Sequence, residues 1–148
     1  MLSVGHLYAS FCSQRDFRER DMSDTMTMRQ NAINWFEIPC EDLDRAADFY
    51  EKILGEKMNR ASAGDPMAMF ASQPTGTGGT LVKRALQRPG RAGTMVYLNC
   101  DGNLDDVLAR IPKAGGLVLF PKTEVPGGHG YFACVRDSEG NHIGLHSH

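Results

Sequence analysis

The sequence predicts an α+β fold made of two βαβββ modules in tandem, at about residues 31–88 and 93–148. The order of one strand, one helix and further strands occurs twice along the chain. Matching residues recur at almost constant spacing, since Cys40 and Cys100 differ by 60 positions and Leu43 and Leu104 by 61. Glycine makes up 16 of 148 residues, above the usual share of about 7%, which indicates many turns and strand ends.

The size and charge of the chain limit the number of domains and the kinds of partner that we expect. Its 148 residues and 41% hydrophobic content suit a single domain. The 16 basic and 18 acidic side chains give a net charge of −2, so no nucleic acid partner is expected. No apolar run approaches the roughly 20 residues that a membrane-spanning helix needs, and we expect no membrane partner.

Residues 1–30 are predicted to form a disordered tail, because residues 11–30 carry many charges without a sustained apolar period. The sequence leaves open whether translation in the native host starts at Met1, Met22, Met26 or Met28. The start of the chain lacks an export signal, and the four cysteines are too widely spaced for a metal knuckle. The expected location is therefore a reducing cytoplasm.

The first module begins with a strand over 33–38 that stops at Pro39. A helix follows, with Asp42 or Asp44 as its cap and apolar residues at three- and four-residue spacing until Gly55 ends it. Clusters of Gly, Pro, Ser and Thr then separate three short predicted strands, near 57–60, 67–71 and 79–83.

The second module repeats this order after the basic connector 83–91, which we interpret as a solvated linker, with an anion-attracting rim as the lesser alternative. A strand over 95–100 leads to a helix over 103–114. Pro112 should bend or shorten this helix, because proline cannot donate a backbone hydrogen bond. Three further strands complete the module, at 117–120, 131–136 and 141–146.

Three segments carry a resemblance to a known family: INWFEIP at 33–39, the helix with Phe49-Tyr50 and Leu54-Gly55, and RDSEGN at 136–141. With these segments the chain resembles the vicinal oxygen chelate superfamily of glyoxalases, bleomycin resistance proteins and extradiol dioxygenases. The resemblance implies two curved mixed sheets that form a cup, a small molecule bound in the cup, and a homodimer. In many members of this superfamily, His and Glu side chains hold a divalent metal in the cup.

The resemblance also implies where metal ligands would stand. The first-strand positions fall on Trp35 and Met95, and the last-strand positions fall near Thr80 or Leu81 and on Gly144. None of these residues offers a carboxylate or an imidazole to a hard divalent ion. We therefore expect no metal and no other cofactor at this site, and lactoylglutathione lyase or dioxygenase activity does not follow from the resemblance.

Strand alternation predicts which side chains face the cup. Successive side chains point to opposite faces, so Phe36 and Ile38 should pack under the first helix, and Leu98 and Cys100 under the second. The opposite face then carries Trp35, Glu37, Met95, Tyr97, Asn99, His142 and His146. This composition is typical of a small-molecule site. The predicted substrate-binding residues are Trp35, Met95, Asn99, His142 and Thr80.

Glu37 is the most informative of the predicted catalytic residues. An acid between Phe36 and Ile38 is either buried and hydrogen-bonded or solvated at the rim of the cup. If it is buried, desolvation would raise its pKa and suit it to proton transfer. We predict Glu37 as the base that abstracts a proton next to a carbonyl, with Tyr97 or His146 bonding the enolate oxygen. Whether the protein catalyses a reaction stays open.

Two other functions remain open. The pocket can sequester a compound without chemistry, or the protein can be a metal-dependent lyase or dioxygenase with relocated ligands, Glu37 with His142 or His146. The two histidines alone cannot chelate one ion, because they are about 13 Å apart at a strand rise of about 3.3 Å per residue. His146 and His148 share a face, but a solvated chain end explains this pair more simply.

Overall fold

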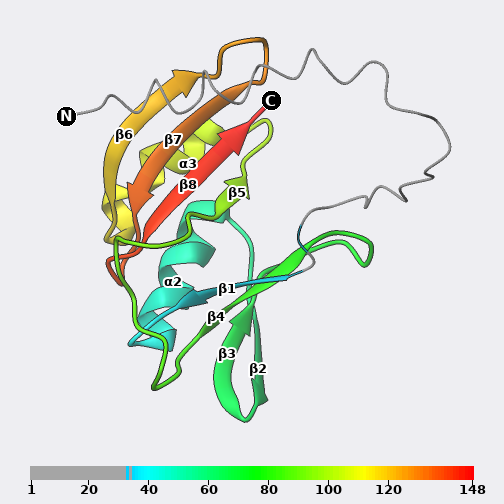
Figure 1. The fold of residues 1–148 in the computed structure, drawn as a ribbon, viewed down its shortest axis with the longest axis vertical. Helices are drawn as coiled ribbons and strands as arrows, with labels where there is room; N and C mark the ends of the chain where they lie inside the picture. Colours follow the sequence, from blue (N-terminus) through cyan, green and yellow to red (C-terminus); the bar gives the residue numbers. More distant parts are fainter. Residues whose placement is uncertain (1–32, 34) are drawn as a thin grey trace, which may run out of the picture.

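The computed structural model describes Ile33 and residues 35–148, and these residues contain both βαβββ modules (Figure 1). The predictions for residues 1–30 and for the start methionines lie outside this described part. The first module consists of β1 (Trp35–Pro39), α2 (Leu43–Leu54), β2 (Asn59–Ala63), β3 (Asp65–Met69) and β4 (Gly78–Val82). The second consists of β5 (Tyr97–Asn99), α3 (Leu104–Arg110), the 3₁₀ turn η1 (Pro112–Ala114), β6 (Leu117–Glu124), β7 (Tyr131–Arg136) and β8 (His142–Ser147).

Each module forms a four-stranded mixed sheet, with the strand orders β1-β4-β3-β2 and β5-β8-β7-β6. The first and last strands of each module pair in parallel, and the remaining pairs are antiparallel. In this register Glu37 lies opposite Thr80, and Tyr97 lies opposite Gly144. The predicted α+β fold of two tandem βαβββ modules is therefore confirmed, because both halves repeat the same strand order and pairing.

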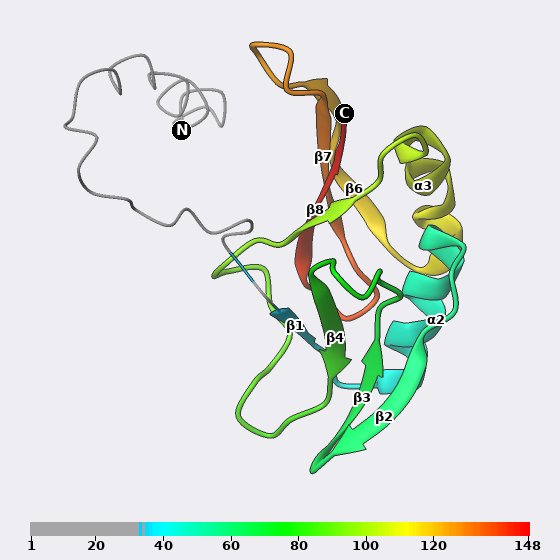
Figure 2. The ribbon, with the colours of Figure 1, turned by 90° about the vertical axis from the view of Figure 1, so that its right-hand side faces the viewer.

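Both helices lie on the same side of the sheets, as Figure 2 shows, and α2 contacts α3 there. The alternation expected for the first strand of each module is confirmed, since Ile38 and Leu98 are buried under the helices while Trp35 and Tyr97 are exposed on the other face. The largest fully buried core side chains include Phe49, Tyr50, Ile53, Leu81, Ile111 and Leu145. This core joins residues of both modules.

The helix ends follow local sequence signals. The Asp42 carboxylate accepts a hydrogen bond from the backbone N–H of Arg45 at 2.9 Å and caps α2. Gly55 ends this helix in the left-handed region at φ 74°. The second helix stops at Arg110, and Pro112 begins the separate turn η1, as the missing proline N–H predicts. No helix of the described residues is long and apolar enough to cross a membrane.

Every strand except β7 has boundaries that differ from the prediction, by one to four residues. Strand β2 begins two residues later than expected and β3 begins two residues earlier, because the hairpin turns at Gly64, which has φ 90°. Strand β6 extends four residues beyond the predicted end at Phe120. It tolerates Pro121 because it is an edge strand whose pairing with β7 has register shifts.

Candidate functional site

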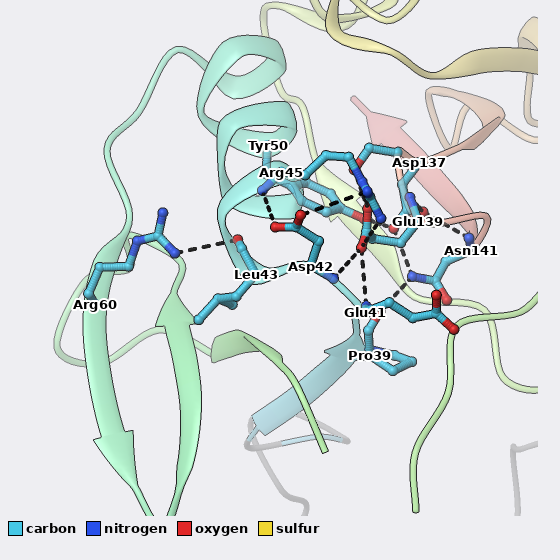
Figure 3. A network of polar contacts seen from close by, with 11 residues as sticks. Pro39, Glu41, Asp42, Leu43, Arg45, Tyr50, Arg60, Asp137, Glu139 and Asn141 are labelled. Atoms are coloured by element: carbon cyan, nitrogen blue, oxygen red, sulfur yellow. Dashed lines mark hydrogen bonds and ion pairs between the residues drawn. The ribbon is translucent and has the colours of Figure 1, made fainter. Parts of the chain in front are cut away.

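The two modules are joined by the hairpin between β7 and β8, which docks onto the start of α2 (Figure 3). The Glu139 carboxylate accepts hydrogen bonds from the backbone N–H groups of Glu41 at 3.1 Å and Asp42 at 2.8 Å. It also accepts two from the Arg45 guanidinium, at 2.7 and 3.1 Å. Burial alone would raise the pKa of Glu139, but the bonds from Arg45 and Asp42 outweigh it, and the pKa is lowered.

Asp137 is the buried centre of the same hairpin. Its carboxylate accepts hydrogen bonds at 2.8 Å from the Tyr50 hydroxyl and from both the backbone N–H and the side-chain amide of Asn141. The Asn141 amide also donates to the Pro39 carbonyl at 2.8 Å. Burial, followed by the nearby Asp137 charge, raises the pKa of Tyr50 well above its usual value. These contacts connect the end of β1 to the start of β8.

A cavity of about 270 Å³ lies beside this junction and is lined by residues of both modules and of the connector. Glu37 from β1 and His142 from β8 both line it, together with Arg88 of the connector and Thr94 before β5. Two residues that the sequence predicts for the site are thus brought together across the two modules. Tyr97 and His146 are not among the residues that line this cavity.

Glu37 is paired with an arginine rather than buried alone. Its carboxylate accepts hydrogen bonds from the Arg84 guanidinium at 2.7 and 3.5 Å, and its side chain is 31% exposed. Arg84 also donates to Asp65 at 2.7 Å, and these two partners raise the pKa of Arg84, Glu37 first. The condition for a desolvated base at Glu37 is therefore not met.

The interpretation of the connector as a solvated linker is wrong at Arg84. Its guanidinium joins Glu37 on β1 to Asp65 on β3 and also donates to the Gln87 side chain at 3.1 Å. A repeat-based reading of the sequence cannot find this residue, because the connector has no counterpart in the second module. The signal that was present is an unpaired acid on a predicted strand, Glu37, which requires a cation or donor nearby.

The sheet face opposite the helices carries exposed aromatic and apolar side chains. Trp35, Met95 and Tyr97 are 49%, 37% and 41% exposed, and the Cys134 thiol lies 3.9 Å from the Met95 sulfur. The Trp35 and Tyr97 rings each lie against a glycine, Gly78 and Gly144, which has no side chain to block the ring. A Cβ at Gly78 would lie 2.8 Å from the Trp35 ring, and one at Gly144 would lie 2.3 Å from the Tyr97 ring.

Three other predicted site residues have partners within the protein. Thr80 is 1% exposed, and its hydroxyl lies 2.9 Å from the carbonyl oxygens of both Ala68 and Leu81. The Asn99 side-chain oxygen accepts from the Asp101 backbone N–H at 2.8 Å. The His146 Nε2 lies 2.8 Å from the His129 carbonyl oxygen. In this arrangement the Thr80 hydroxyl is not open to a ligand.

The relocated metal ligands considered from sequence do not form a group of three potential ligands in the described residues. Among the residues that the structure describes, no group of three His, Cys, Asp or Glu side chains within ligand distance includes Glu37 or His142. The group that does form contains Asp101, His146 and His148. Cys40 and Cys100 are buried in the core, and burial raises the pKa of each thiol to about 11.

Comparison with known proteins places this geometry in a family. Residues 32–145 match the model of the Glyoxalase/Bleomycin resistance protein/Dioxygenase superfamily. A search of curated proteins finds no match.

Solved structures share the same fold. The hypothetical protein SA1046 from S. aureus is 27% identical with a TM-score of 0.59, over 82% of this chain and 95% of that chain. A glyoxalase/bleomycin resistance protein from Albidiferax ferrireducens T118 is 18% identical with a TM-score of 0.62, over 80% and 99%. The fosfomycin resistance protein FosX from Listeria monocytogenes is 16% identical with a TM-score of 0.57, over 80% and 93%.

Proposed function

Because the chain belongs to the glyoxalase/bleomycin resistance protein/dioxygenase superfamily, we propose that it binds a small organic molecule between its two modules. The observation that carries this proposal is the cavity of about 270 Å³ lined by Glu37 of the first module and His142 of the second. A volume at the small end of ligand pockets suits a compact molecule rather than a peptide.

The exposed face beside the cavity supports an aromatic or carbonyl-bearing ligand. Trp35 and Glu37 lie on the same face of β1, so a molecule whose polar group reaches Glu37 can place an apolar ring against Trp35. Arg88 also lines the cavity, and its side chain is 79% exposed; an anionic group of a ligand would compete there with the Glu41 carboxylate, which lies 3.7 Å from the guanidinium. The ligand class we propose is therefore a small aromatic carbonyl compound that can carry a carboxylate.

We propose that the ligand is held without a metal at the positions that relatives use. The resemblance assigns those positions to Trp35, Met95, Gly144 and either Thr80 or Leu81, and their side chains are poor ligands for a divalent ion. At Gly144 the space above the backbone contains the Tyr97 ring. The residues at this centre therefore fit ring contacts better than metal coordination.

Binding without chemistry is the simpler form of this function. The Arg84 guanidinium holds the Glu37 carboxylate at 2.7 Å, so this carboxylate is already engaged when no ligand is bound. Proton abstraction next to a carbonyl is the second candidate, because Glu37 and His142 line the same cavity. In that case a ligand would have to displace Arg84 from Glu37 before proton transfer.

The test uses the fluorescence of Trp35, the only tryptophan in the chain. Phenylpyruvate and benzoylformate are titrated into the wild-type protein, and a saturable change in emission is expected. Glu37→Gln and His142→Gln should weaken binding, whereas Glu124→Gln, an exposed site at the end of β6, should not. Absence of a saturable signal with both compounds, or equal binding by all variants, would contradict the proposed pocket.

The same probes separate binding from catalysis. Phenylpyruvate has exchangeable protons next to its ketone, and benzoylformate has none. If the protein is a proton-abstracting enzyme, it will exchange these protons for deuterium faster than buffer does, and Glu37→Gln will abolish the excess rate. If phenylpyruvate binds saturably but its protons exchange for deuterium no faster than in buffer, the protein sequesters the compound without catalysing a reaction.

Two further proposals concern the assembled protein. We propose a homodimer, because apolar side chains such as Trp35, Leu117 and Leu119 remain exposed on a single chain. Light scattering during size-exclusion chromatography at micromolar concentration tests it.

We also propose a cytoplasmic location, which suits the free thiols of Cys40, Cys100 and Cys134.

A further inference from the structure

Three potential metal ligands meet where β5 and β8 end. The backbone N–H of Cys100 donates to the His146 carbonyl at 2.7 Å, which places Asp101 beside the end of β8. The backbone N–H of His148 then donates to the Asp101 carboxylate at 2.8 Å. As a result, one ligand atom each of Asp101, His146 and His148 lies within 4.8 Å of the other two.

The ring of His146 is oriented by a partner outside this group. Its Nε2 lies 2.8 Å from the His129 carbonyl oxygen, in the loop between β6 and β7. A carbonyl accepts only, so this contact requires the proton on Nε2, and the neutral ring then has its Nδ1 lone pair left for a cation. The loop is held close to the chain end at Gly130, where an added Cβ would lie 2.8 Å from the His148 Cα.

A backbone carbonyl that fixes the second nitrogen of a histidine is the usual outer partner of metal-binding imidazoles. We propose that Asp101, His146 and His148 form a binding site for one divalent transition metal ion of the zinc and nickel class. Two imidazoles and one carboxylate suit these ions, and three protein ligands leave positions for water or a bound molecule.

The geometry needs only a small adjustment to hold an ion. Ligand atoms around a tetrahedral zinc at about 2.0–2.1 Å are roughly 3.4 Å apart. The ligand atoms of the three residues now lie within 4.8 Å of one another. The side chains of His148 and Asp101 are 74% and 50% exposed, so rotation of these two side chains can bring the ligand atoms to the shorter separation. The rings of His146 and His148 already meet edge to face with centroids 4.9 Å apart.

This site differs from the positions that the family resemblance assigns to metal ligands. His146 stands two residues beyond Gly144 on the same face of β8, and Asp101 and His148 stand on neither β5 nor β8. The inference rests on these contacts and does not depend on the proposed small-molecule function. The competing explanation is a metal-free ion pair between His148 Nδ1 and Asp101, which are 3.5 Å apart.

The test is calorimetric titration of zinc chloride into the full chain, prepared without a histidine tag and dialysed against chelator and then buffer. One saturable site per chain is expected. Asp101→Asn, His146→Gln and His148→Gln should each weaken binding by about tenfold or more. His142→Gln is the matched control, because it removes a histidine from the same strand outside the group, and it should bind as wild type does.

Cobalt supplies a second readout that does not depend on affinity alone. The visible absorption of bound Co²⁺ should show a low-coordinate site in the wild type and in His142→Gln, and it should be lost in His148→Gln. His148 follows β8 at an exposed position, so this variant should keep the wild-type circular dichroism spectrum. No saturable zinc binding, or equal binding by the ligand variants and the control, would overturn the proposal.

Discussion

The ring of Tyr97 lies over the backbone of Gly144, its partner in the parallel pairing of β5 with β8. A Cβ at position 144 would lie 2.3 Å from the ring, closer than real atoms approach. The observed position of the Tyr97 ring therefore requires a residue without a side chain at position 144. A side chain at 144, including the carboxylate that a metal-binding relative would place there, requires Tyr97 to move.

We predict that Gly144→Ala lowers the free energy of unfolding by about 1–3 kcal/mol, because the new methyl group overpacks against Tyr97. In the Tyr97→Ala background the same change should cost clearly less, since the ring that it meets is gone. Urea unfolding of the two single variants and the double variant measures this coupling.

Gly90→Ala is the control for the glycine substitution itself. An added Cβ at Gly90 meets nothing within 4 Å, and its backbone lies outside the left-handed region. This variant should keep the wild-type stability or gain slightly through the unfolded chain. If Gly144→Ala lowers the free energy of unfolding equally with and without the Tyr97 ring, the proposed clash between the new methyl group and this ring is wrong.

A second prediction concerns the hydrogen bond between Tyr50 and Asp137, which joins α2 of the first module to the hairpin of the second at 2.8 Å. Tyr50→Phe should lower the free energy of unfolding by about 1–2 kcal/mol, because both groups are buried and Asp137 loses one donor. Tyr131→Phe is the control, since Tyr131 is 40% exposed. Equal denaturation midpoints for the wild type and Tyr50→Phe would show that this bond does not hold the modules together.

Local signals explain why much of the fold was predictable. The cap at Asp42, the stop at Gly55 and the break at Pro112 each depend on the conformational preference of one residue, and each occurs as expected. The predicted position of β2 is wrong because its sequence, Asn-Arg-Ala-Ser-Ala, has only alanines as apolar residues and therefore a weak alternation. Its position is set by pairing with β3 instead.

The site was less predictable because its contacts join distant parts of the chain. Alternation predicts the face of Glu37, but its Arg84 partner lies 47 positions away in a segment without periodicity. Asp101 and His148 are also 47 positions apart. Such contacts arise only when segments far apart in the sequence have folded against each other, and no local propensity encodes them.

A third prediction follows from the lowered pKa of Glu139. The folded protein binds this proton less readily than the unfolded chain, whose carboxyl has the ordinary value of 4.5. The stabilisation is therefore complete above about pH 5 and is lost as the pH falls through the lower folded value. Urea midpoints between pH 7 and pH 3 should fall less steeply in Glu139→Gln than in the wild type.

Glu139→Gln should also be less stable than the wild type at pH 7, because it loses the ionic bond to Arg45, and this difference should shrink at low pH. Glu124→Gln, at an exposed position, should follow the wild-type profile. Parallel profiles for the wild type and Glu139→Gln would mean that another carboxylate governs acid unfolding of the described domain.

The last prediction concerns thiol reactivity. Burial first, with nearby Glu139 for Cys40 and Asp101 for Cys100, raises the pKa of both thiols from 9.0 to about 11. At pH 8 this shift reduces the thiolate fraction by about 100-fold, and burial also blocks the reagent. Iodoacetamide should therefore modify Cys134, which is only partly buried, well before Cys40 and Cys100. Mass spectrometry of digested samples assigns each site over time, and urea should abolish the protection. Labelling of Cys40 or Cys100 as fast as Cys134 in the folded protein would contradict the burial of these two thiols in the core.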